Sequence, residues 1–293
     1  MLARRLMLTV AVTVAFLGAP ALAGKLTNPS FETVSGGDAR APQLLLNDID
    51  WMKLSDGVPG GDGNPYVADN GVTNNNDFLP ASSIANWTVL DVVDWVSDGY
   101  WTAQDGDRSV DLSGSAPGGL YQAFDTSERD TGDPTKRPIY AVEFYLSGNP
   151  GPNDTNLGGQ GGIRTIEILV GDGTPTINSV AENDVTFSGA FGTILHTTRT
   201  FDTDSLVPDI PDPAHDDPIP DMGWQQILGI QFELPDNALT ELTVLFRSLD
   251  NTPYGPAIDD ADVEFTGFTP EPGTMSLLLL GGVAALARRR RRS

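Results

Sequence analysis

The sequence predicts an all-β protein, an antiparallel sandwich of the jelly-roll type, with an N-terminal signal peptide and a short C-terminal hydrophobic helix outside it. Between its two ends the chain lacks the period of 3.6 residues that marks an amphipathic helix. Apolar and polar residues instead alternate in short runs, as in strands with one buried face. Clusters of Gly, Pro, Asn and Asp separate these runs and supply turns. Many short strands divided by turns are typical of antiparallel sandwiches.

The alternation is clearest in residues 139–148, IYAVEFYLSG, where Tyr140, Val142, Phe144 and Leu146 share the face that we expect to be buried. Trp87 and Trp224 stand at the starts of strands and are expected in the core. The strands predicted from such runs cover residues 109–114, 119–124, 139–148, 164–172, 224–234, 240–249 and 260–268.

The first residues have the three parts of a signal peptide in order. Arg4 and Arg5 precede an apolar run, and the small-residue pattern Ala21-Leu22-Ala23 follows. We therefore expect a signal peptide at residues 1–23, with cleavage after Ala23; a buried core helix is the alternative. Residues 24–269 would then form the exported domain, and one domain of this length is usual for all-β proteins.

The last residues combine a proline motif, an apolar stretch and a run of arginines. Residues 274–287 are shorter than the roughly 20 that a stable membrane span needs, and Arg288–Arg292 would remain on the cytoplasmic side. Pro270, Glu271 and Pro272 followed by these two elements resemble the PEP-CTERM sorting signal of Gram-negative bacteria. The resemblance implies a 270–293 sorting signal, a transient inner-membrane stage, processing by an exosortase, and release to the cell surface or the exopolysaccharide matrix. A plain C-terminal anchor with a proline-containing linker is the alternative.

The charge of the chain excludes one class of partner. The formal net charge is −23 at pH 7, and without the terminal arginines it is more negative still. Such a surface repels nucleic acid and attracts cations. The chain has no cysteine, so an exported domain of this kind must be stabilised by its core, helped by any bound metal.

Two stretches interrupt the strand pattern and are expected to be insertions. Residues 36–83 are long and polar, and residues 202–221 are rich in Asp and Pro, which a sheet does not readily accept. Within the first, DGVPGGDGN (56–64) is similar to a loose calcium loop but lacks the EF-hand spacing, so a turn is the simpler interpretation.

Four pieces read in order carry a second resemblance: LTNPSFE (26–32), residues 84–114, GGLYQAFDT followed by YAVEFYLSGNP, and residues 242–265. This order resembles the choice-of-anchor C family and the related plant cell-wall domain of unknown function. The resemblance implies a galactose-binding-like β-sandwich. The segment DTSERDTGDPTKRPIY is longer than the family's tight turn, so that loop cannot be transferred.

Neighbouring first and last strands would bring Glu32 close to Asp259 or Asp260. Converging carboxylate and carbonyl oxygens suit Ca²⁺, and related carbohydrate-binding sandwiches carry a structural calcium in this region. By resemblance we expect Ca²⁺ at Glu32, Asp259 and Asp260. The alternative is that Asp259 only accepts backbone hydrogen bonds at a turn.

The motifs of nucleophilic and zinc catalysis are missing from the sequence, so no catalytic residue is predicted. His196 and His215 do not have a zinc-site spacing, no GxSxG is present, and there is no thiol. A glycosidase-like pair of carboxylates remains open. Its candidates crowd one region: Asp91, Asp94, Asp98, Asp105, Asp107 and Asp111.

Sugar binding is the better candidate, because aromatic rings stack on sugars while nearby polar groups bind hydroxyls. We predict a site of this kind at Trp95, Tyr100, Trp101 and Asp105, although Trp95 could also be a core residue. The sequence thus favours an exported, non-catalytic carbohydrate-binding or structural protein of the extracellular polysaccharide layer. A polysaccharide hydrolase and a passive, cation-binding matrix component are the alternatives.

Overall fold

A computed structural model describes the sandwich and several flanking segments. The residues described are 24–33, 35, 51–55, 79–80, 84–98, 100–114, 116–127, 136–149, 162–205, 222–235 and 239–269. The predicted signal peptide, the sorting signal and most of the two predicted insertions lie outside them.

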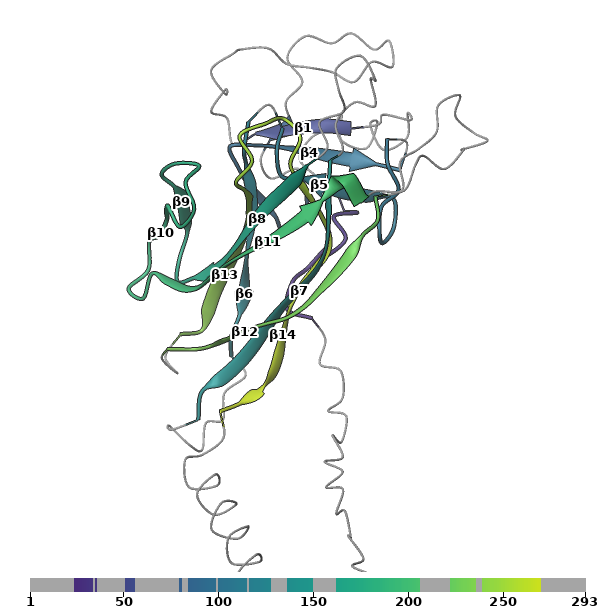
Figure 1. Ribbon diagram of the computed structural model, residues 1–293. Helices are drawn as coiled ribbons and strands as arrows, with labels where there is room; N and C mark the ends of the chain where they lie inside the picture. The colour runs from purple at the N-terminus through teal and green to yellow at the C-terminus, as the bar shows by residue number, and fades with distance from the viewer. Residues whose placement is uncertain are drawn as a thin grey trace, which may run out of the picture.

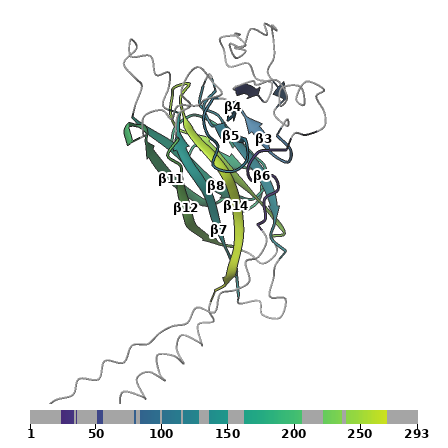
Figure 2. The same ribbon diagram turned by 90° about the vertical axis from the view of Figure 1, so that its right-hand side faces the viewer.

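Two sheets pack face to face (Figures 1 and 2). The seven-stranded sheet has the order β12-β7-β14-β5-β4-β1-β2, and the five-stranded sheet has the order β11-β8-β13-β6-β3. A separate β9–β10 hairpin lies on the side of the five-stranded sheet that faces away from the other sheet (Figure 1). All pairings are antiparallel except that of β1 with β2. The predicted antiparallel β-sandwich is confirmed.

The seven-stranded sheet consists of β1 (Trp51–Ser55), β2 (Leu79–Pro80), β4 (Val92–Ser97), β5 (Arg108–Asp111), β7 (Pro138–Gly148), β12 (Gln225–Glu233) and β14 (Pro256–Phe268). The five-stranded sheet consists of β3 (Thr88–Leu90), β6 (Gly119–Asp125), β8 (Ile163–Gly171), β11 (Thr193–Asp202) and β13 (Glu241–Ser248). The hairpin consists of β9 (Pro175–Ile177) and β10 (Val185–Phe187), and a short 3₁₀ turn, η1 (Thr203–Ser205), follows β11.

Strand β7 has the burial pattern that its alternation predicts. Tyr140, Val142, Phe144 and Leu146 are all buried in the core between the sheets. The ring of Phe144 meets that of Phe246, from β13 in the other sheet, at a centroid distance of 5.2 Å. Because apolar area removed from water contributes about 25 cal/mol per Å², this interdigitated core is the main stabilising element of the fold.

The seven predicted strands all occur, with bounds that shift by a few residues. The described residues contain seven further strands outside these predicted ranges, and two of them, β1 and β2, lie inside the stretch expected to be an insertion. Strand β1 pairs with β4 and extends the sheet, and Leu54 in it is fully buried. The stretch expected to be an insertion thus contributes strands to the sheet, which the sequence did not indicate because the short apolar run WMKLS lies among polar neighbours. Likewise, β11 and η1 occupy residues 202–205 at the start of the second predicted insertion.

The N-terminal segment, residues 24–33, lies along β14. Lys25 donates its backbone N–H to the carbonyl of Val263, and Ala261 donates to the carbonyl of Pro29. At this point the register of β14 shifts between Asp259 and Asp262, and Asp260 has a positive φ of 45°. The bulge thereby turns backbone groups of β14 toward the N-terminal segment. The predicted closeness of the first and last segments is thus observed, although the first is not a strand.

Candidate functional site

The loop of residues 98–107 connects β4 to β5 and folds over the outer face of the seven-stranded sheet. Its main packing residue is Trp101, which is 1% exposed and lies in a small apolar cluster with Val96, Met222 and Ala257. The indole Nε1 donates to the hydroxyl of Ser109 at 2.7 Å. A buried ring with a satisfied N–H fixes the loop against the sheet.

Carboxylates hold the backbone of this loop. Asp259 Oδ2 accepts the N–H groups of Gln104 at 2.7 Å and of Asp105 at 3.0 Å. Glu32 Oε1 accepts the N–H of Asp107 at 2.9 Å. These carboxylates come from β14 and the N-terminal segment, so the loop depends on residues far away in the sequence.

Two further hydrogen bonds complete the anchoring. Asp98 Oδ1 accepts the N–H of Ala103 at 2.8 Å within the loop. The hydroxyl of Ser30 donates to Asp105 Oδ2 at 2.6 Å. Together these hydrogen bonds make the loop a rigid part of the sandwich.

Burial disfavours the charged forms of two of these carboxyls, Asp259 and Glu32. Burial, together with a smaller contribution from nearby Glu32, raises the pKa of Asp259 to about 7 against the opposing effect of the N–H groups of Asp105, Asp260 and Gln104. Burial also raises the pKa of Glu32, against the N–H groups of Asp107 and Arg108. The site therefore favours neutral carboxyls or a nearby positive charge.

The predicted sugar-binding residues do not form one exposed site. Trp95 is 4% exposed and belongs to the core between the sheets, and Trp101 is buried under its own loop. Neither ring has a free face in this structure, so the prediction that they stack on a sugar is corrected: both are packing residues. Tyr100 is half-buried, and Asp105 is exposed.

Trp224 packs against the loop of residues 98–107 and was not predicted as part of the site. Trp224 precedes β12 and is half-buried, whereas the sequence predicted a core residue; Trp87 is in the core as expected. The indole Nε1 of Trp224 donates to the carbonyl of Thr102 at 2.8 Å. Tyr100 and Trp224 both pack against the Trp101 cluster, and Thr102 and Gln104 beside them are exposed. We name Tyr100, Thr102, Gln104, Asp105 and Trp224 the aromatic platform.

The three predicted calcium ligands lie near this loop but are used otherwise. Both carboxylate oxygens of Asp259 accept backbone N–H groups, because Oδ1 accepts that of Asp260 at 2.7 Å. Among the described residues no group of three or more His, Asp or Glu side chains is arranged to hold a metal ion. This geometry fits the alternative in which Asp259 anchors a turn, and calcium stays a prediction.

Several of the carboxylates considered for hydrolysis also have structural partners. Asp111 is fully buried and accepts hydrogen bonds from the backbone of Ser113 and Gly255 and from the side chain of Asn149. Asp98 binds the loop backbone. Both oxygens of Asp111 are therefore engaged within the fold, and Asp98 uses Oδ1 to hold its loop.

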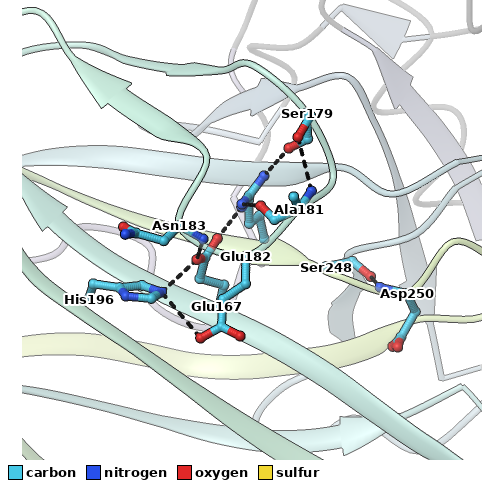
Figure 3. Close-up of polar contacts among 9 residues, drawn as sticks. Glu167, Ser179, Ala181, Glu182, Asn183, His196, Ser248 and Asp250 are labelled. Carbon is cyan, nitrogen blue, oxygen red and sulfur yellow. Dashed lines mark hydrogen bonds and ion pairs between the residues drawn. The ribbon is translucent and has the colours of Figure 1, made fainter.

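The sequence reasoning missed a buried ion pair on the outer face of the five-stranded sheet. Arg247 of β13 pairs through Nε with Glu167 of β8, and both are at most 1% exposed (Figure 3). His196 of β11 lies 2.6 Å from Glu167, measured from Nε2 to Oε1. Arg247 and Glu167 lie in expected strands, but no local pattern shows that the segment between β9 and β10 folds over them.

Comparison with known proteins identifies the C-terminal residues. Residues 268–292 match the PEP-CTERM protein-sorting motif. The chain carries a PEP-CTERM sorting motif. This motif indicates export and sorting to the cell surface by an exosortase, as predicted from Pro270, Glu271 and Pro272. The motif residues beyond Thr269, and the expected cleavage pattern at Ala21 and Ala23, lie outside the described residues. Within the described part of the chain, no helix has the length and apolar character of a membrane span.

No curated protein matches the sequence. Among solved structures, the chain is similar to TmCBM61 in complex with β-1,4-galactotriose, with 11% identity, a TM-score of 0.35, and coverage of 83% of this chain and 99% of the other. A CBM4 structure gives 12% identity, a TM-score of 0.35 and coverage of 82% and 99%. A cyclase from Fischerella sp. TAU gives 10% identity, a TM-score of 0.36 and coverage of 85% and 98%. At these scores the likenesses support no statement about the function of this chain.

Proposed function

We propose that this surface-sorted protein is a non-catalytic module that binds extracellular polysaccharide through the aromatic platform. The observation that carries the proposal is that two half-buried rings, Tyr100 and Trp224, pack on one cluster at a loop that also exposes Thr102, Gln104 and Asp105. Rings of this kind bind the apolar faces of sugars, and the polar groups bind their hydroxyls.

Rigidity supports the same role. The loop that carries most of the platform is anchored by the buried ring of Trp101 and by hydrogen bonds to the carboxylates of Asp259 and Glu32. A site whose backbone is already ordered loses little conformational entropy on binding. The sorting motif supports a location in which polysaccharide is the available ligand.

The test is retention on polysaccharides and a glycan array with the purified chain. Tyr100→Ala and Trp224→Ala should each weaken retention at least fivefold, since one stacked ring contributes about 1 kcal/mol or more. Phe191→Ala is the matched control, because Phe191 is a 43% exposed aromatic residue far from the platform in the fold. Equal retention by the parent and both platform variants would remove the site. Release of reducing ends would support the hydrolase alternative. The absence of both binding and release would support the passive matrix component.

We also propose that Ca²⁺ binds at Glu32, Asp259 and Asp260. Burial raises the pKa of all three carboxyls, and a divalent cation bound there would stabilise their charged forms. The hydrogen bonds already accepted by Asp259 speak against the site. A melting temperature unchanged by EDTA would remove it.

A further inference from the structure

Residues 172–192, here named the cover, fold back from the ends of β8 and β11 onto the outer face of the five-stranded sheet. The cover contains β9 and β10, which pair with each other and with neither large sheet. Its underside contributes Ile177, Val185 and Phe187, which pack on Leu169 and Leu245 of the sheet. The cover is thus attached by side chains rather than by a β-ladder.

The neck of the cover is closed on itself. Asp172 donates its N–H to the carbonyl of Gly192 at 2.9 Å and accepts the N–H of Gly189 at 2.7 Å. Gly173 and Gly192, one at each end, have positive φ values of 90° and 59°, which side chains other than glycine rarely adopt. Such a neck keeps the cover together as a unit and places the permissive residues at its two connections.

The buried pair of Arg247 and Glu167, here named the latch, holds residues 179–183, the tip of the cover. Arg247 donates from Nη1 to the carbonyl of Ser179 at 2.7 Å and from Nη2 to that of Ala181 at 2.6 Å (Figure 3). Glu167 Oε1 accepts the N–H of Asn183 at 2.5 Å. One pair of side chains on the sheet therefore binds three backbone groups of the tip.

His196 lies at the edge of the latch. Its Nε2 is 2.6 Å from Glu167 Oε1 and 3.8 Å from Oε1 of Glu182, a residue of the cover (Figure 3). The imidazole therefore lies between a carboxylate of the sheet and one of the cover.

The latch stabilises the closed cover only weakly for the number of hydrogen bonds it makes. Burying an ion pair costs desolvation energy that the mutual attraction of the charges only partly offsets. If the cover lifts, Arg247 and Glu167 remain adjacent on neighbouring strands and regain water. Opening therefore costs less than the number of contacts suggests.

From the separate hairpin, the closed neck and the buried charged latch, we propose that the cover swings off the outer face of the five-stranded sheet as a unit while the sandwich stays folded. This motion uncovers Leu169, Leu245 and the ion pair. It is a conformational device independent of the aromatic platform, which lies on the other sheet.

Thiol labelling tests this motion cleanly because the chain has no cysteine. Leu245→Cys places a thiol under the cover, and Val244→Cys places one in the core between the sheets; both side chains are 0% exposed. Under native conditions the thiol at position 245 should react with a disulfide reagent at least about tenfold faster than that at 244, since local opening needs less free energy than global unfolding. Equal rates in the native protein would overturn the proposal, and equal rates in urea serve as the control.

Two additions keep the test sharp. Leu169→Cys against Ile168→Cys repeats the comparison on β8, in case substitution at 245 prevents folding. Arg247→Met should accelerate labelling at 245 or 169, and 244 or 168 should remain the slower position of each pair, whereas Arg199→Met, on the edge strand β11, should leave the rates unchanged. Phe187→Ala, which weakens the cover without leaving a buried charge, should act like Arg247→Met. If neither substitution accelerates labelling, the latch assignment is wrong.

Discussion

The side-chain amide of Asn149 donates to Asp111 Oδ2 at 2.7 Å, and Asp111 has no exposure to solvent. The other carboxylate oxygen accepts the N–H groups of Ser113 and Gly255. Asp111 therefore ties the end of β5 to the turn before β14 and to the residue after β7.

Asp111 predicts how stability depends on pH. Burial raises its pKa to about 7, while its hydrogen bonds and Arg164 oppose the shift. A carboxyl whose pKa is higher in the folded than in the unfolded state stabilises the fold fully only below its unfolded pKa. This contribution falls as the pH rises from near 4 and is lost above about 7. Asp259, with its pKa also raised to about 7, acts in the same direction.

We therefore expect a melting temperature several degrees higher at pH 5 than at pH 8. In Asp111→Asn the slope between these two pH values should be smaller than in the parent. Differential scanning fluorimetry over this range measures it, and a parent protein that is more stable at pH 8 would contradict the assignment.

Trp101→Ala should destabilise the sandwich by about 3–5 kcal/mol, the usual cost of removing a fully buried aromatic side chain. Trp101 is packed against Val96, Met222 and Ala257, and its loss leaves a cavity as well as an unpaired Ser109. Urea unfolding measures the change. Trp224→Ala, at a half-buried ring, should cost clearly less; equal costs would show that the two rings have the same structural role.

Asp259→Ala should release the loop of residues 98–107. It removes the acceptor of two loop N–H groups, Gln104 and Asp105, and should lower the free energy of unfolding by about 1–3 kcal/mol. Hydrogen exchange at these amides should accelerate, while β7 amides stay protected. Asp107→Ala is the control, because that carboxyl lies exposed on the same loop; unchanged exchange in Asp259→Ala would argue against the anchoring role.

Gly118→Ala should be poorly tolerated. A Cβ on Gly118 would lie 2.1 Å from the carbonyl oxygen of Val92, and this backbone atom cannot move without disturbing β4. We expect a loss of about 3 kcal/mol, measured by thermal unfolding. Ala123→Thr, at an exposed position of the following strand β6, adds atoms where there is room and should leave stability unchanged.

The strands that alternate over many residues were predictable, and the short or irregular ones were not. Strand β7 shows its core-facing side in the sequence, because the side-chain period of two is a local property. Strands β9 and β10 have three residues each, too few for a pattern. Of the aromatic residues predicted for the candidate site, only Tyr100 belongs to the aromatic platform. Trp95 and Trp101 are buried, and Trp224, expected in the core, is half-buried.

From its sequence alone, this chain is an acidic β-sandwich without cysteines and with a sorting motif after its last strand. Composition, alternation and ordered terminal motifs are properties of neighbouring residues, so they can be read without a fold. The partners of Trp101 and of Arg247 come from segments distant in the chain, Met222 and Ala257 for one and Ser179 and Ala181 for the other. Only the packing of the loops onto the two sheets decided which rings face water and which charges lie under the cover.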